Sequence, residues 1–228
     1  MSAHEILRTL RSLGSKKARE GMERFGITSN HALGISTPVM KSLARKIGRD
    51  HALAAALWSS GIFEARIIAA LIDEPEKVTR GQMDRWVKVF DSWAICDGCC
   101  CYLFRRTPFA WSKAVEWSKH RSEFIKRAGF SLMAYLAVHD KEAHDKAFEK
   151  LLPIIEREAR DERLYVRKAV NWALRQIGKR NLRLNRLAIQ AAKRIRAQGT
   201  SSSRWIAADA LRELQSQAVQ ARLAKKKS

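Results

Sequence analysis

The chain has 228 residues, of which 44 are Lys or Arg and 23 are Asp or Glu, so its formal net charge is +21. No apolar run approaches the roughly 18 residues of a membrane span, and the first residues lack the basic and apolar regions of a secretory signal, so we expect a cytoplasmic protein. A positive excess of this size repels itself unless a polyanion is bound, which favours nucleic acid as the partner over a merely basic surface or an anionic membrane.

Amphipathic periodicity predicts a succession of helices. After two short helices and a loop, Thr37-Pro38 predicts a helix start, because threonine caps free N–H groups and proline is tolerated at the first helical position. The predicted helices are 3–13, 15–25, 38–47, 50–60, 62–73, 79–90, 92–105, 108–119, 122–138, 140–158, 161–179, 182–197 and 203–223. No stretch alternates with the period of a strand, so the predicted fold class is all-α, with one domain over 1–223 and a disordered basic tail over 224–228.

Similar segments recur along the chain at intervals of about 40 residues. They begin at Lys126, Arg167 and Arg204, and a fainter copy begins at Glu64. Two helices per interval of this length are typical of HEAT-like repeats, so we predict a right-handed solenoid with a concave basic groove. The alternative is a helical bundle of different connectivity.

Within the predicted helix 161–179, the helical period separates core positions from exposed positions. The apolar stripe contains Val166, Val170, Ala173 and Ile177, and the opposite face carries Lys168, Trp172, Arg175 and Lys179. A large aromatic side chain among cations is expected on a surface that binds nucleic acid. There the cations contact the phosphates, and the aromatic ring makes an apolar contact. The alternative is that Trp172 packs on the next repeat.

The helical period also separates core positions from exposed positions in the predicted helix 122–138. Its apolar stripe contains Ile125, Ala128, Leu132 and Leu136, so Glu123 and Arg127 are predicted to point outward. Alone, this exposed pair is weak evidence of a function, since an i,i+4 ion pair is common on surfaces and contributes only about 0.3–0.5 kcal/mol. However, Lys168 is the repeat equivalent of Arg127, and stacked repeats would place both cations on one concave face.

The stretch from Asp91 to Cys101 holds an aspartate in an otherwise apolar helical run. Ser92 is a predicted N-cap, so the helix begins at Trp93, and Trp93 and Asp97 then share one face because they are four residues apart. A carboxylate taken out of water must find partners or change its pKa, so the position of Asp97 indicates a function.

All four cysteines lie between Cys96 and Cys101. Neighbours on one helix cannot bridge separate segments, which argues against a disulfide framework. A tetrahedral zinc site takes ligands from two separated pairs, and His139 with His144 would supply only one weak external pair. We therefore expect no metal site and interpret the cysteines as small buried residues in a reducing compartment.

Three segments together resemble the signature regions of a known family. They are Trp93-x-x-x-Asp97 after Ser92, Arg127 within its Ile-Lys-Arg-Ala segment, and the run from Lys168 to Arg175, with the turn that ends at Pro38 as a fourth similarity. These segments are similar to the signature regions of the AlkD family of bacterial DNA alkylation repair glycosylases, and they occur in the same order. The similarity extends from about residue 22 to about residue 215. The resemblance implies a solenoid of HEAT-like repeats, DNA in its concave groove, and excision of cationic N3- and N7-alkylated purines.

The resemblance also implies roles for individual residues. It assigns the catalytic carboxylate to Asp97 and places Trp93 and Trp172 beside the deoxyribose of the damaged nucleotide. The positions that it and the repeat pattern assign to DNA binding are Arg127, Lys168, Arg175 and Lys179. The segment Ala94-Ile95-Cys96 departs from the family, in which this stretch is often more polar and follows a second aromatic residue.

The chemistry suits these residues, because an alkylated purine is already cationic and leaves without protonation. The remaining difficulty is the positive charge that builds on the sugar, which a fixed carboxylate would stabilise and to which tryptophan faces would add about 0.5–2 kcal/mol of cation–π attraction. We therefore expect a monofunctional alkylpurine DNA glycosylase that acts on duplex DNA without base flipping. We expect it to work as a monomer, without a cofactor, and to associate with the nucleoid when bound to DNA. The alternatives are a catalytically silent DNA-structure-binding protein on the same scaffold and a protein-binding HEAT-like adaptor, which the charge disfavours.

Overall fold

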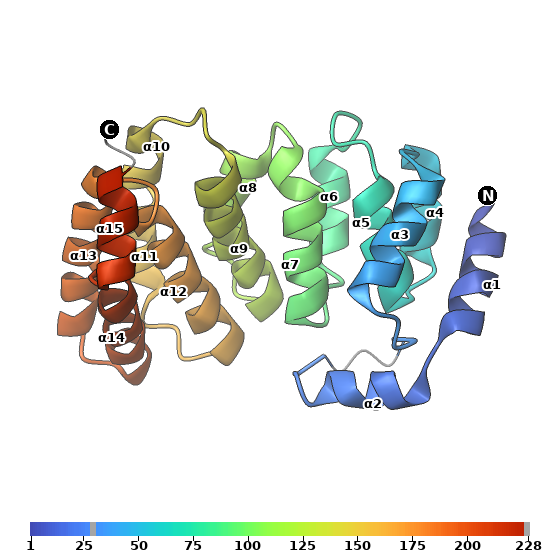
Figure 1. The fold of residues 1–228 in the computed structure, drawn as a ribbon, viewed down its shortest axis with the longest axis horizontal. Helices are drawn as coiled ribbons and strands as arrows, with labels where there is room; N and C mark the ends of the chain where they lie inside the picture. Colours follow the sequence, from blue (N-terminus) through green and yellow to red (C-terminus); the bar gives the residue numbers. More distant parts are fainter. Residues whose placement is uncertain (28–30, 226–228) are drawn as a thin grey trace. The chain divides into compact units, whose positions relative to one another are not determined.

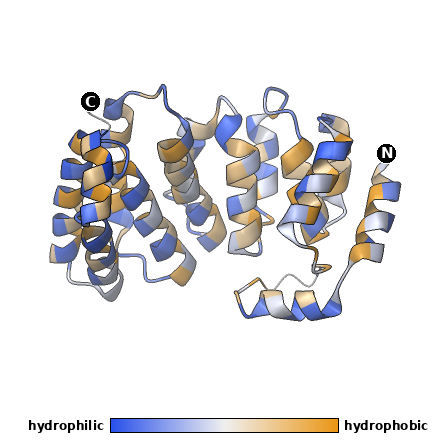
Figure 2. Cartoon of the chain, in the orientation of Figure 1, coloured by the Kyte–Doolittle hydropathy of each residue, from blue (hydrophilic) through white to orange (hydrophobic). Residues whose placement is uncertain are grey.

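The computed structural model describes residues 1–27 and 31–225, and all regular elements within this part of the chain are helices, as predicted (Figure 1). The chain forms two compact units, Met1–Phe109 and Ala110–Ser228. In the described ranges, no helix is long and apolar enough to cross a membrane. Most helices carry both hydrophobic and hydrophilic residues, as amphipathic helices do (Figure 2).

The first unit contains the helices that are numbered α1 to α7 and a short 3-10 helix, η1. Their bounds are α1 Ala3–Leu13, α2 Lys16–Glu23, α3 Thr37–Ile47, α4 His51–Ser59, α5 Phe63–Ile72, α6 Arg80–Val87, α7 Trp93–Tyr102 and η1 Phe104–Arg106. The start of α3 differs by one residue from the prediction, because Ser36 is the N-cap and Thr37 is the first helical residue. Pro38 is therefore second, where its missing N–H is equally harmless.

The second unit contains α8 to α15. Their bounds are α8 Ala110–Trp117, α9 Glu123–His139, α10 Asp145–Glu149, α11 Leu152–Glu158, α12 Leu164–Gly178, α13 Leu182–Ala197, α14 Ser201–Leu214 and α15 Gln217–Lys225. Two predicted helices, 140–158 and 203–223, are each divided in two. The second division follows from side-chain amides, since Asn185 and Gln220 both donate to the Leu214 carbonyl at the end of α14. Ala224 and Lys225 are helical rather than part of a tail, and the rest of the predicted tail, 226–228, lies outside the described residues.

A fully buried glutamate anchors the turn before α3. Glu64 of α5 is 0% exposed, and its carboxylate accepts backbone N–H hydrogen bonds from Leu33 (2.9 Å), Gly34 (2.8 Å) and Ile35 (3.2 Å). Gly34 has φ +81°, and a Cβ there would lie 2.4 Å from the Ser15 carbonyl oxygen. Only glycine fits both the left-handed backbone and this close approach, which explains the turn that the sequence showed.

The core of the first unit places α7. Trp58 and Trp86 stack with ring centroids 3.9 Å apart, and the aromatic contacts continue through Phe90 to Phe104 of η1, which follows α7. On its other side α7 packs closely on α5, since a Cβ at Gly98 would lie 2.6 Å from Ile67 Cδ1. This small residue lets the two helices approach, so the outward face of α7 is held in a fixed orientation.

The second unit is a stack of helix pairs. In one layer α9, α12 and α14 pack side by side, and α8, α11 and α13 pair with them in the other layer. Hydrogen bonds between successive repeats join residues 38 apart, from Asn171 to Asp209 and from Arg175 to Glu213. This separation is close to the interval of about 40 residues that the sequence pattern predicted for HEAT-like repeats.

Candidate nucleic-acid interface

One set of candidate residues lies on α7, in the first unit. Ser92 caps the helix by accepting from the Ile95 N–H at 3.5 Å, so that Trp93 is the first helical residue, as predicted. Trp93 Nε1 donates a hydrogen bond to the Phe25 carbonyl oxygen at 2.8 Å. Trp93 and Asp97 are both partly exposed. An aromatic face and a carboxylate therefore lie on neighbouring turns of one helix, in contact with solvent.

Three of the four thiols of α7 lie in the core of the first unit, and Cys96 and Cys100 are within one helical turn of Trp93 and Asp97. Cys96, Cys99 and Cys100 are free and 0% exposed, and Cys101 is partly exposed, which agrees with their interpretation as small core residues. Burial raises the pKa of the Cys99 and Cys100 thiols, and the nearby charge of Asp97 adds to the rise at Cys100. These thiols stay protonated at neutral pH, so they serve packing rather than nucleophilic chemistry. Over the described ranges, no group of three or more His, Cys, Asp or Glu residues is placed to hold a metal ion.

A second, separate set of candidate residues lies on α12, in the second unit. The predicted core stripe is confirmed, because Val166, Val170, Ala173 and Ile177 are all fully buried. Lys168 is exposed and Trp172 is partly exposed.

The Trp172 ring packs edge-to-face on Tyr135 of α9, with centroids 4.8 Å apart and an interplanar angle of 83°. Its Nε1 donates to the Gln176 side-chain oxygen at 3.0 Å when that amide faces the indole. Trp172 therefore packs on the neighbouring repeat and presents the remainder of its ring to solvent.

The prediction that Arg127 points outward is wrong, and Glu123 is only partly exposed. Arg127 is 6% exposed, and its Nη1 donates to the Tyr165 carbonyl oxygen at 2.8 Å. The Glu123 carboxylate accepts from the Tyr165 N–H at 3.1 Å and so caps the first turn of α12. The face of α9 that would be exposed in a single helix is covered by the next repeat. The observed role of Arg127 is to join two repeats, and its assignment to phosphate binding stays a prediction.

Arg175 and Lys179 are also engaged, in contrast to the outward position predicted for them. Arg175 Nη1 lies 2.5 Å from Glu213 Oε2 and 3.4 Å from Asp209 Oδ2, and Lys179 Nζ lies 2.6 Å from Glu213 Oε1. Burial favours a raised pKa for Glu213, but the hydrogen bond and charge of Lys179 and those of Arg175 hold it below its ordinary value. These two cations therefore join α12 to α14 through a shared carboxylate.

Sequence reasoning missed the acidic partners of these cations. Asp209 and Glu213 occupy α14 at the repeat interval from Asn171 and Arg175, so opposite charge at this interval was the signal that could have identified them. Other positive charge lies on the layer that does not carry Trp172. Arg186, Lys193 and Arg196 of α13 are exposed and form no ion pair with any residue that the structure describes.

The stacked helix pairs define a helical-repeat protein. The model of the family described as "DNA alkylation repair enzyme" matches residues 6–214, and the chain belongs to this family. One solved structure with the same fold has a TM-score of 0.75 and 20% sequence identity over 85% of this chain and 83% of that chain. It is described as "A new family of proteins related to the HEAT-like repeat DNA glycosylases with affinity for branched DNA structures". The predicted all-α fold of HEAT-like repeats is thereby confirmed. A comparison with curated proteins found no match.

Proposed function

We propose that this protein is a monofunctional DNA glycosylase that hydrolyses the N-glycosidic bond of cationic N3- and N7-alkylated purines in duplex DNA. The observation that carries the proposal is the pair formed by Trp93 and Asp97 on one solvent-accessible face of α7, in a member of the DNA alkylation repair enzyme family. A carboxylate beside an aromatic face is a suitable environment for a sugar that becomes positively charged.

In the proposed reaction, the C1′–N bond breaks first and its electrons go to the cationic base, which leaves as a neutral purine. The positive charge then lies on the deoxyribose, where the Asp97 carboxylate stabilises it and orients the attacking water. Such preorganised electrostatic stabilisation is worth on the order of a few kcal/mol. Water adds at C1′ and loses its proton, which leaves an abasic sugar. Because the base needs no general acid, the reaction does not require an enclosed pocket around an extruded base.

The residues of α12 are proposed to contact the DNA rather than the leaving base. Lys168 is exposed and free to approach a phosphate, and Trp172 offers part of its ring as an apolar contact. Trp93 has its polar edge bound to the Phe25 carbonyl, so the indole keeps one orientation when a sugar approaches it. A fixed aromatic face loses little conformational freedom on binding.

The proposal is tested by incubating the purified protein with duplex DNA that contains N7-methylguanine and measuring the free base by chromatography. We expect release above the spontaneous rate, no release of undamaged purines, and loss of release with Asp97→Asn. If wild-type protein at saturating concentration binds the damaged duplex but does not accelerate release, the glycosylase assignment is wrong.

A second candidate is a catalytically silent protein that binds DNA structures. The observation that favours it is the affinity for branched DNA structures given for the solved relative of the same fold. Electrophoretic mobility shifts with a four-way junction and with a linear duplex of equal length distinguish the two functions. The silent binder is supported if the junction binds at least about tenfold more tightly and no base is released from alkylated DNA.

A further inference from the structure

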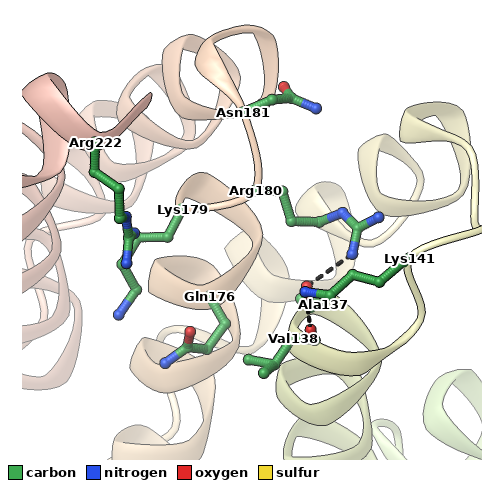
Figure 3. Close-up of a pocket in the computed structure, with 8 residues that line it drawn as sticks. All are labelled: Ala137, Val138, Lys141, Gln176, Lys179, Arg180, Asn181 and Arg222. Atoms are coloured by element: carbon green, nitrogen blue, oxygen red, sulfur yellow. Dashed lines mark hydrogen bonds between the residues drawn. The ribbon is translucent and has the colours of Figure 1, made fainter. Parts of the chain in front are cut away.

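A cavity of about 330 Å³ opens in the second unit, between the C-terminal ends of α9 and α12 and the helix α15 (Figure 3). Its lining includes four cationic side chains and no carboxylate: Lys141, Lys179, Arg180 and Arg222. Figure 3 shows Lys141 and Arg180 on one side of the cavity and Lys179 and Arg222 on the other. Such a gathering of like charges is unfavourable unless an anion joins it.

The C-terminus of a helix ordinarily repels anions, because its last carbonyl groups point outward with partial negative charge. At α9 these carbonyls are already engaged. Arg180 Nη1 donates to the Ala137 oxygen at 2.7 Å and to the Asp140 oxygen at 2.8 Å, and Lys141 Nζ donates to the Val138 oxygen. The ammonium of Lys141 still has donors to offer, since a lysine carries three N–H groups. The two cations thus offset the partial negative charge of this helix end.

The other side of the cavity has one engaged cation and one that is available. Lys179 binds Glu213 at 2.6 Å, and Glu213 is shared with Arg175, so one carboxylate serves two cations. Arg222 is exposed on α15 and forms no hydrogen bond or ion pair with the residues that the structure describes. A guanidinium with five N–H donors therefore lies at the cavity without a partner among the described residues, and such a group binds phosphate oxygens well.

The cavity continues the face of α12 that carries Trp172. Gln176 lines the cavity and, with its amide facing the indole, accepts from Trp172 Nε1 at 3.0 Å, so one residue of the lining contacts the indole directly. A phosphate held there would lie beside any nucleotide that Trp172 contacts.

We propose that this cavity is a phosphate-binding site formed by Arg222 together with Lys141 and Lys179. In the complex with DNA, the ligand is a backbone phosphate that flanks the nucleotide in contact with Trp172. The DNA source of the phosphate rests on the proposed function, whereas the affinity of the cavity for phosphate does not. Sequence patterns did not identify Arg222 because α15 lies outside the three similar segments.

The first arm of the test measures binding of undamaged duplex DNA over a series of salt concentrations. Arg222→Gln should weaken binding several-fold and reduce the slope of log K against log salt by about 0.9, the value for one lost phosphate contact. Arg186→Gln is the matched control, because it removes one exposed, unpaired arginine from α13, away from the cavity. It should change both quantities less. Circular dichroism checks that each variant is folded, and Arg222→Lys should restore part of the slope.

The second arm titrates inorganic phosphate and follows the amide resonances of Gln176 to Asn181 by nuclear magnetic resonance. Saturable shifts in the wild type that are lost in Arg222→Gln, together with the changed salt slope, support the proposal. Saturable phosphate binding with an unchanged DNA slope overturns the DNA assignment and leaves a site for a free phosphate compound. An unchanged slope without saturable shifts overturns the whole proposal. Neither arm measures excision, so a failure of the glycosylase assay bears on the proposed function alone.

Discussion

Trp93 Nε1 donates a hydrogen bond of 2.8 Å to the main-chain carbonyl of Phe25, which joins the first residue of α7 to the segment after α2. Phe25 itself is largely exposed. The bond spans 68 residues of sequence, so the orientation of the indole depends on how the N-terminal helices pack. The position of the aromatic face beside Asp97 is therefore a property of the first unit and not of α7 alone.

The first prediction concerns this hydrogen bond. Trp93→Phe keeps an aromatic face but removes the N–H donor, so single-turnover excision should slow several-fold because the ring is no longer held in one orientation. The melting temperature should fall little, since the hydrogen bond is solvent-accessible and contributes only about 0.5–1.5 kcal/mol. Trp93→Ala is the reference variant and should slow excision further. Equal rates for Trp93→Phe and the wild type would show that the Phe25 contact does not position the indole.

The second prediction separates the cations of α12 by their partners. Lys168→Ala should reduce the salt slope of DNA binding by about 0.9 and leave stability unchanged, since Lys168 is exposed and without an ion pair among the described residues. Arg175→Ala should instead lower stability by about 1 kcal/mol, because it breaks a partly exposed ion pair with Glu213. Salt-dependent binding and chemical denaturation of both variants test this. A larger loss of salt slope for Arg175→Ala would show that Arg175 exchanges Glu213 for phosphate in the complex.

The third prediction concerns acid stability. Burial would raise the pKa of Asp161, but hydrogen bonds from Arg163 and Lys126 lower it from 3.8 to about 2. A carboxylate with a depressed pKa in the folded state contributes stability that is fully present above pH 3.8 and is lost as the pH falls toward 2. Asp161→Asn should therefore be less stable than the wild type at neutral pH, and the difference should shrink as the pH falls to about 2. Chemical denaturation across this range measures the difference, and the exposed control Glu20→Gln should show none. A difference that stays constant with pH would mean that the ion pair does not cause it.

The helices and their buried faces could be predicted from the hydrophobic periodicity of the sequence. The apolar stripe predicted for α12 is buried at all four positions, Val166, Val170, Ala173 and Ile177. Patterns of this kind depend on one helix at a time. Arg127 lies on the side of α9 that a single helix would leave in water, and only the stacking of α12 covers it. Where the polar face of a helix becomes an interface between repeats, the periodicity of that helix cannot distinguish solvent from a partner.

The candidate functional residues also include some that local sequence patterns predict and some that they do not. The cap at Ser92 and the shared face of Trp93 and Asp97 depend on neighbours within four residues, and the sequence was sufficient to predict them. The contact from Trp93 to Phe25 and the phosphate cavity at Arg222 depend on residues that are far apart in the sequence. No local spacing encodes such contacts, so they required the structure.

The fourth prediction concerns Trp172. Its ring is partly exposed and packs on Tyr135 without entering the core stripe of α12, so Trp172→Ala should cost about 1–2 kcal/mol, less than the roughly 3–5 kcal/mol of a core tryptophan. Excision should nonetheless slow, because the apolar contact with DNA is lost. Thermal denaturation and single-turnover kinetics measure the two effects. A stability loss in the range of a core tryptophan would show that packing between repeats is the main role of this residue.

The last prediction concerns Asp97 and separates an enzyme from a silent binder. Asp97→Asn keeps the shape of the side chain and removes its negative charge, so DNA should bind equally or more tightly because one repulsion with phosphate is gone. Excision should fall by on the order of 10²-fold or more, since the charge that stabilises the sugar cation is absent. The loss should appear in the single-turnover rate constant and not in the affinity, which requires both to be measured on the same alkylated duplex.

Two other outcomes for Asp97→Asn would each contradict the proposal in a different way. If the variant unfolds, Asp97 is a structural acid, and the partly exposed position of its side chain on α7 does not reflect a catalytic role. If the variant folds, binds and excises at the wild-type rate, the carboxylate takes no part in the reaction. Asp91→Asn is the matched control, because Asp91 is an exposed aspartate just before the same helix and its substitution removes the same charge. A rate loss confined to Asp97→Asn would therefore come from the position of the carboxylate on α7, and an equal loss in both variants would come from the general change in charge.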